Sequence, residues 1–140
     1  MKHKLLLLII FFSSLSFAQS KTESKEWIVE KYNEFKRVNE YSNEFDLNFE
    51  NEFLIIKTYK SLYKIQIKDI KKIQIKKERW DNDDKEGWSS VYFYYGKNDS
   101  VEITMSSEFI ESGYKKRMEN ALLHLIKLYG GNATIKKEAF

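Results

Sequence analysis

The sequence predicts an α+β fold, in which an N-terminal helix and a C-terminal amphipathic helix flank an antiparallel meander of about six strands. Apolar residues recur with a helical period near both ends of the chain and with a period of two between them. Short polar links join the alternating segments, and no stretch rich in Gly, Ser or Pro interrupts them. These observations indicate a single domain with one core.

The first 18 residues have the three-part pattern of a secretory signal peptide. They begin with basic residues, continue with an apolar run that resumes through Phe17, and place the small residues Ser16 and Ala18 where a signal peptidase reads. We therefore expect cleavage between Ala18 and Gln19. A buried core helix or a membrane anchor is the alternative, but the run is shorter than the roughly 20 residues that span a bilayer.

Cleavage would leave residues 19–140 as one exported domain in the periplasm or the extracellular space, without a transmembrane anchor. It removes two of the 24 basic residues and none of the 21 acidic ones, so the mature chain is close to neutral and we expect no nucleic-acid partner. The absence of cysteine excludes disulfides and a lipoprotein anchor. The Lys-, Ile- and Asn-rich composition indicates a bacterial protein.

The first element of the mature chain is predicted to be a helix over residues 22–39. Ser20 or Thr22 offers N-cap chemistry at its start. One face carries an apolar stripe at helical spacing, formed by Trp27, Ile28, Tyr32, Phe35 and Val38.

Six segments alternate between apolar and polar residues and predict strands. Polar links such as Asn51-Glu52 and residues 96–99 separate them and predict tight turns. The predicted strands cover residues 45–49, 53–57, 63–68, 72–76, 91–95 and 101–105.

The last element is predicted to be a helix over residues 113–129. Gly130-Gly131 supplies a left-handed stop at its end, and we expect residues 132–140 to be loosely ordered. The apolar stripe of this helix consists of Tyr114, Met118, Ala121, Leu122, Leu125 and Tyr129.

No motif of nucleophilic, metal or nucleotide chemistry is present, so we expect neither an enzyme nor a bound cofactor. His124 is the only histidine after the signal segment, and its position on the shoulder of the last helix predicts a boundary residue without a role. Zinc would need more nitrogen or sulfur ligands. The acidic loop 81–86 indicates a solvated hairpin tip or a weak calcium site, because Lys85 and Glu86 break the EF-hand spacing.

The most unusual surface feature is basic. The sequence Lys-Ile-Gln-Ile-Lys occurs twice, at residues 64–68 and 72–76, which indicates two neighbouring strands. If these strands pair, their outward lysines share one face that could attract an acidic ligand. Solvation and protection against aggregation are the alternative reasons for such a face. The lysines are Lys64, Lys68, Lys72 and Lys76.

The segment 91–95 is apolar or amphipathic on both faces, because Tyr92 and Tyr94 alternate with Val91, Phe93 and Tyr95. A central strand with one face on the sheet core and the other under a helix explains this pattern. An aromatic ligand platform is the alternative.

The stretch from Tyr63 to Ile73, with its Asp69-Ile70 corner, resembles the strand, corner and next strand of pleckstrin-homology-like modules. The hairpins and amphipathic helix that follow extend the resemblance over residues 44–130. The chain departs from that pattern in having about six strands rather than seven and a helix before the sheet. The resemblance implies a PH-like half-barrel and a binding module, and it carries over no catalytic residue.

Together these patterns favour a non-catalytic binding or assembly module of the bacterial envelope, with an envelope protein or an acidic ligand as its partner. A small secreted hydrolase that uses surface carboxylates and an inhibitor or immunity-like protein remain the alternatives.

Overall fold

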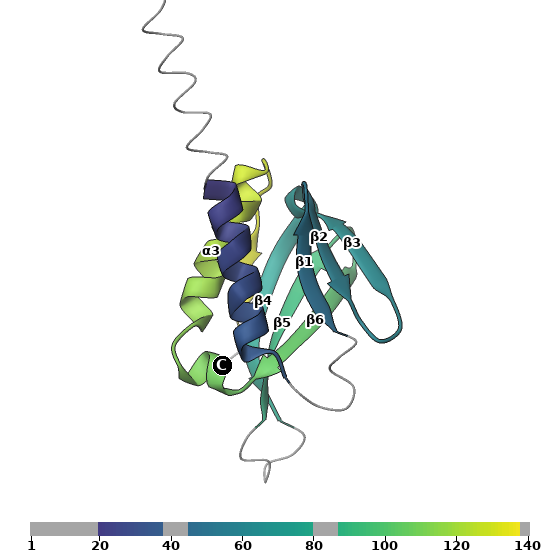
Figure 1. Ribbon diagram of the computed structural model, residues 1–140. Coiled ribbons are helices and arrows are strands. Elements are labelled where there is room, and N and C mark those ends of the chain that lie inside the picture. Colours follow the sequence, from purple (N-terminus) through teal and green to yellow (C-terminus); the bar gives the residue numbers. More distant parts are fainter. Residues whose placement is uncertain (1–19, 38–44, 80–86, 138–140) are drawn as a thin grey trace, which may run out of the picture.

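The computed structural model describes residues 20–37, 45–79 and 87–137, which form three helices, a short 3-10 turn and two sheets around one core (Figure 1). The predicted signal segment with Ala18 and Gln19, and the acidic loop 81–86, lie outside the described residues. No helix in the described part of the chain is both long and apolar enough to cross a membrane.

The N-terminal helix is helical over residues 20–35 and buries Ile28, Tyr32 and Phe35, three residues of the predicted stripe. It ends earlier than the predicted residue 39. Lys36 forms an isolated antiparallel bridge to Met105, so the backbone at this point turns from helical to sheet pairing.

The first sheet is antiparallel and has the order β1-β2-β3. β1 (Asp46–Glu50) and β2 (Phe53–Lys57) are joined by the predicted two-residue turn, where Asn51 adopts a φ of 51°. Asparagine tolerates this left-handed conformation better than most residues, which suits it to a tight hairpin. β3 (Leu62–Gln66) pairs with β2.

The second sheet has the order β6-β5-β4-β7. Its long strands β4 (Ile70–Glu78), β5 (Trp88–Tyr95) and β6 (Asp99–Ser106) are antiparallel and contain three of the predicted strands. The strands of the described segments do not close into a barrel, because the two sheets share no paired strand.

The chain passes from the first sheet to the second through a 3-10 turn, η2 (Ile67–Asp69). The expectation that the two Lys-Ile-Gln-Ile-Lys segments are neighbouring, paired strands is therefore wrong. The first segment spans β3 and η2, the second lies in β4, and β3 and β4 belong to different sheets. The predicted strand 63–68 ends at Gln66, because the three residues of η2 that follow redirect the chain.

The C-terminal helix α3 (Lys115–Leu128) follows a short helix, α2 (Glu108–Glu111), and lies beside the N-terminal helix (Figure 1). Beyond it, β7 (Thr134–Ile135) pairs in parallel with β4. The segment after residue 132, which the sequence predicted to be loosely ordered, thus contains a strand that extends the second sheet. The single apolar residue Ile135 is too short a pattern to reveal it.

Alternate residues of the second sheet face the core. In β4 and β5 these include Ile73, Ile75, Val91 and Phe93, each no more than 1% exposed. They join the buried residues of both helices and of the first sheet in one cluster. The opposite, outer face of this sheet is therefore free to carry polar side chains.

Candidate functional site

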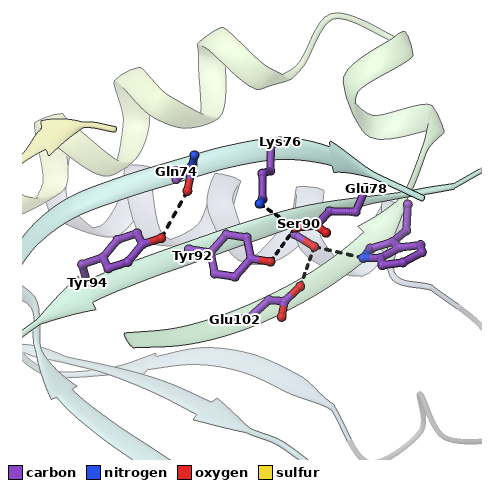
Figure 2. Close-up of polar contacts among 8 residues, drawn as sticks. Gln74, Lys76, Glu78, Ser90, Tyr92, Tyr94 and Glu102 are labelled. Carbon is purple, nitrogen blue, oxygen red and sulfur yellow. Dashed lines mark hydrogen bonds and ion pairs between the residues drawn. The ribbon is translucent and has the colours of Figure 1, made fainter. Parts of the chain in front are cut away.

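The outer face of the second sheet carries a row of aromatic and polar side chains, shown in Figure 2. A register irregularity between Ile70 and Lys72 keeps Lys72 in phase with the outward residues of β4. The strand register then places four outward residues of β4 opposite outward residues of β5, and it places Tyr92 of β5 opposite Glu102 of β6. We call this set the outer face: Lys72, Gln74, Lys76, Glu78, Trp88, Ser90, Tyr92, Tyr94 and Glu102.

Ser90 links two neighbouring side chains of the outer face. Trp88 donates from Nε1 to Ser90 Oγ over 3.0 Å, and Ser90 Oγ donates to Glu102 Oε1 over 2.5 Å. Ser90 is fully buried beneath these neighbours. Because a buried hydroxyl without partners is costly, this chain of hydrogen bonds lets a polar residue lie in the middle of the sheet.

A second contact joins Tyr92 to Glu78, whose carboxylate also pairs with Lys76 at 3.1 Å. The hydrogen bond from Tyr92 lowers the pKa of Glu78, Lys76 lowers it further, and partial burial opposes both. Burial and the hydrogen bond to Glu78 raise the pKa of the Tyr92 phenol. Glu78 is therefore a carboxylate at neutral pH, and Tyr92 is a neutral hydrogen-bond donor.

Tyr94 donates a 3.1 Å hydrogen bond to Oε1 of Gln74, which is only 7% exposed. The rings of Tyr92 and Tyr94 stack, with centroids 6.3 Å apart and planes 28° apart. Gln74 and the two phenols thus support one another, which gives the centre of the outer face a defined geometry.

A cation lies over each aromatic ring of the outer face. The Nζ of Lys76 lies 5.2 Å from the Tyr92 centroid, and that of Lys136 lies 4.8 Å from the Tyr94 centroid. Arg37 lies over the Trp88 ring at 5.1 Å. The two tyrosines therefore form part of a surface that presents cations to solvent rather than bare rings.

At one end of the outer face, an open cleft of about 500 Å³ forms around the turn between β5 and β6. Its turn begins at Gly96, where φ is 60° and where a side chain would lie 2.9 Å from an oxygen of Asp99. Glycine adopts this left-handed conformation without strain. We call this the basic cleft, and its lining is Lys71, Lys72, Tyr94, Tyr95, Gly96, Lys97, Asn98 and Asp99.

The electrostatics of the basic cleft are positive. Lys71, Lys72 and Lys97 line it, and Asp99 is its single acidic residue. Within the described segments none of the three lysines forms an ion pair. A second cleft of about 440 Å³ shares Lys71, Tyr95 and Gly96 with it and adds Lys64 and Asp69. The two clefts extend the positive surface from the second sheet to the first.

The structure does not bring the four predicted lysines onto one face. Lys72 lines the basic cleft, and Lys76 is paired with Glu78 on the outer face. Lys64 lies in the other sheet, 3.8 Å from Glu50, and exposed Lys68 lies in η2. Their separation follows from the placement of β3 and β4 in different sheets.

Sequence reasoning missed Lys71 and Lys97 as partners of Lys72. They meet because the register pairs Ile70 with Tyr95 and Lys72 with Tyr94, so the start of β4 lies beside the turn that carries Lys97. The polar link 96–99 was a visible signal for the turn. The strand that lies next to it depends on long-range pairing.

The remaining candidate from the sequence, His124, lies in α3. His124 is exposed, and its Nε2 lies 2.9 Å from Oγ of Ser20, which connects the two helices. Residues 20–37, 45–79 and 87–137 contain no group of three His, Cys, Asp or Glu residues that could hold a metal ion.

Comparison of the chain with protein-family models, curated proteins and solved structures finds no match.

Proposed function

We propose that the protein is a non-catalytic, exported binding module of the bacterial envelope, and that it binds an anionic ligand in the basic cleft. The observation that carries this proposal is the convergence of Lys71, Lys72 and Lys97 on one open cleft without ion-pair partners among the described residues. Like charges held together repel one another, and an anion that enters between them relieves this repulsion.

The shape and chemistry of the cleft suit a ligand with carboxylate or phosphate groups. Its volume of about 500 Å³ falls within the usual range for small-ligand sites. Asn98 adds an amide, and Tyr94 and Tyr95 add aromatic surface beside the charges. Lysine ammonium groups act as point charges without the fixed fork of arginine, so we expect selection for negative charge rather than for one anion geometry.

Binding is favoured over hydrolysis by the state of the carboxylates on the outer face. A general acid needs a carboxyl group with a raised pKa, whereas Tyr92 and Lys76 lower the pKa of Glu78. Glu102 is engaged by the Ser90 hydroxyl. The resemblance to pleckstrin-homology-like modules also implies binding rather than catalysis.

Export is supported by the signal pattern at the N-terminus. N-terminal sequencing of the protein recovered from the periplasm or the medium tests this part. We expect the mature chain to begin at Gln19, and recovery of chains that begin at Met1 would contradict export with cleavage.

The ligand proposal is tested by titrating the protein with polygalacturonate, polyglutamate and inorganic phosphate, using calorimetry. The variant K72Q/K97Q should bind a polyanion at least about tenfold more weakly, which is about 1.4 kcal/mol. The control K116Q/K127Q removes the same charge from exposed positions of α3 and should bind like the wild type. Equal weakening in both variants would indicate general attraction and would sink the proposal, as would no binding of the wild type to any of the three probes.

A further inference from the structure

The hairpin between β2 and β3 carries exposed apolar side chains at its tip. Tyr59 is 55% exposed and Leu62 is 68% exposed, and within the described segments they are the large hydrophobic residues that face solvent. The ring of Phe45 lies beside Tyr59, with centroids 6.0 Å apart. Three apolar side chains from two neighbouring segments therefore gather at one end of the first sheet.

The tip is a defined turn rather than a loose loop. Thr58 N donates to Ser61 O over 2.8 Å, and Ser61 N donates to Thr58 Oγ1 over 3.1 Å. Lys57 and Leu62 are paired directly beneath it. These contacts hold Tyr59 and Leu62 away from the core, because the hydrogen bonds fix the backbone between them.

Lysines outnumber acidic residues around the tip, where Asp46 of β1 lies opposite Lys57. The sequence from Phe53 to Lys68 contains four lysines and neither Asp nor Glu. Two of these lysines, Lys57 and Lys60, flank the apolar tip and are exposed. Lys60 Nζ lies 4.9 Å from the centroid of the Tyr59 ring, so charge and aromatic surface are adjacent.

We propose that this hairpin tip docks on an anionic lipid surface. Tyr59 and Leu62 insert at the boundary between headgroups and acyl chains, while Lys57 and Lys60 contact the headgroups. Tyrosine favours this boundary, and lysine can extend its ammonium group to the headgroups while its stem lies against apolar material. The lysines add electrostatic attraction to the anionic lipids.

The convex shape of the tip favours lipid over a protein partner. A stable protein interface buries about 800 Å² on each side and needs a surface that fits the protrusion. The exposed side chains of Tyr59 and Leu62, with the two lysines that flank them, offer little area of that kind. A lipid interface can deform around them. A protein partner would leave vesicle binding absent, which is one outcome of the test below.

The lipid surface and the anionic ligand of the basic cleft use different ends of β3. Leu62 begins the strand at the hairpin tip, and Gln66 ends it at the cleft that adjoins the basic cleft. An experiment can therefore contradict lipid docking of the hairpin tip without contradicting anion binding in the basic cleft, and the reverse also holds.

The absence of cysteine from the chain allows a site-specific test in which a single cysteine carries an environment-sensitive fluorophore. We place it at the tip with S61C and at a distant exposed position with S112C. Vesicles of phosphatidylcholine with phosphatidylglycerol should raise the fluorescence of labelled S61C and leave that of S112C unchanged. An equal response at both positions, or none at S61C, would overturn the proposal.

Unlabelled variants test the two parts of the contact in vesicle co-sedimentation. Y59S/L62S should bind these vesicles at least about tenfold more weakly. K57Q/K60Q should also lose about tenfold and should become less sensitive to salt. K116Q/K127Q should bind like the wild type, and pure phosphatidylcholine should bind poorly. Unchanged binding of Y59S/L62S would contradict insertion of the tip.

Discussion

The Tyr92 hydroxyl donates a hydrogen bond of 2.5 Å to Oε1 of Glu78 and thereby joins the central strand β5 to β4 on the outer face. The same carboxylate pairs with Lys76, whose ammonium lies over the Tyr92 ring (Figure 2). Phenol, carboxylate and ammonium thus form a closed set of three contacts. This set fills one part of the outer face. It leaves the lysines of the basic cleft, which have no ion-pair partner among the described residues, as the more accessible charges.

Loss of the Tyr92 hydroxyl should destabilise the fold. In Y92F the ring remains, but the carboxylate of Glu78 loses a donor. We expect the free energy of unfolding to fall by about 1 kcal/mol, since the site is partly exposed and a hydrogen bond to a charged group contributes somewhat more when buried. Urea denaturation followed by circular dichroism measures this change, and an unchanged midpoint would show that the bond contributes nothing.

The contribution of Glu78 should depend on pH in a defined direction. Its pKa is lowered from the ordinary 4.5, so the folded state holds the charged form more strongly than the unfolded state does. The stabilisation is therefore complete above about pH 4.5 and is lost as the pH falls through the folded-state pKa. We expect E78Q to be less stable than the wild type at neutral pH and to approach it in acid.

A matched control for this experiment is E52Q, which removes a carboxylate from an exposed position in the turn between β1 and β2. E52Q should differ little from the wild type in urea denaturation at neutral pH, whereas E78Q should be clearly less stable. A difference between E78Q and the wild type that does not change with pH would contradict the role assigned to the Glu78 carboxylate.

Removal of the Tyr32 hydroxyl should stabilise the protein. This side chain is 1% exposed, and its oxygen has no hydrogen-bond partner among the described residues. Burial raises the pKa of Tyr32 to about 12. Because an unpaired buried hydroxyl costs about 1 kcal/mol or more, Y32F should raise the free energy of unfolding by about that amount. A loss of stability in Y32F would reveal a hidden partner of the hydroxyl.

The dependence of the free energy of unfolding on pH in the alkaline range gives a second test of the buried Tyr32 hydroxyl. The folded state resists ionisation of Tyr32, so the wild type should lose stability as the pH rises from about 10 to about 12. Y32F should lose less over that range, as measured by urea denaturation. Parallel curves for the two proteins would contradict the assignment.

The two glycines after α3 should respond differently to alanine. A Cβ on Gly131 would lie 2.7 Å from both Ile126 Cγ2 and Lys68 O, so G131A must push the chain away from η2. We expect a loss of about 2 kcal/mol. Gly130 has a φ of 82° with open space around it, so G130A should cost about 1 kcal/mol through backbone strain alone. Thermal unfolding compares them, and equal costs would contradict the close contact at Gly131.

The pairing of the C-terminal segment should protect one amide from hydrogen exchange. Lys136 N donates to Ile73 O over 2.8 Å, whereas the amide of Lys137 forms no such bond in the described part of the chain. We expect slower exchange at Lys136 than at Lys137, measured by NMR after transfer to deuterated solvent. Equally fast exchange at both amides would contradict the pairing of β7 with β4 and would support the loosely ordered tail that the sequence predicted.

The positions of the strands and helices follow from the sequence because they depend on local patterns. The apolar run after the Asn51-Glu52 turn located β2 at residues 53–57 without error, and the apolar stripe of α3 identified Met118, Leu122 and Leu125 as core residues. The tight turn at Asn51 was equally local, since its geometry depends on the residues of the turn itself.

The candidate site follows only from the tertiary structure, because it depends on which strands pair. Alternation says that Lys72 and Lys76 share a face, but it does not say that Lys64 lies in another sheet. Nor does it say that Lys97 lies near Lys72, or that Lys136 covers Tyr94. By itself the sequence determined the fold class, most of the elements and the side chains available for binding. The pairing of β4 with β5 and β7 decided which of them meet, because pairing joins residues that are distant along the chain.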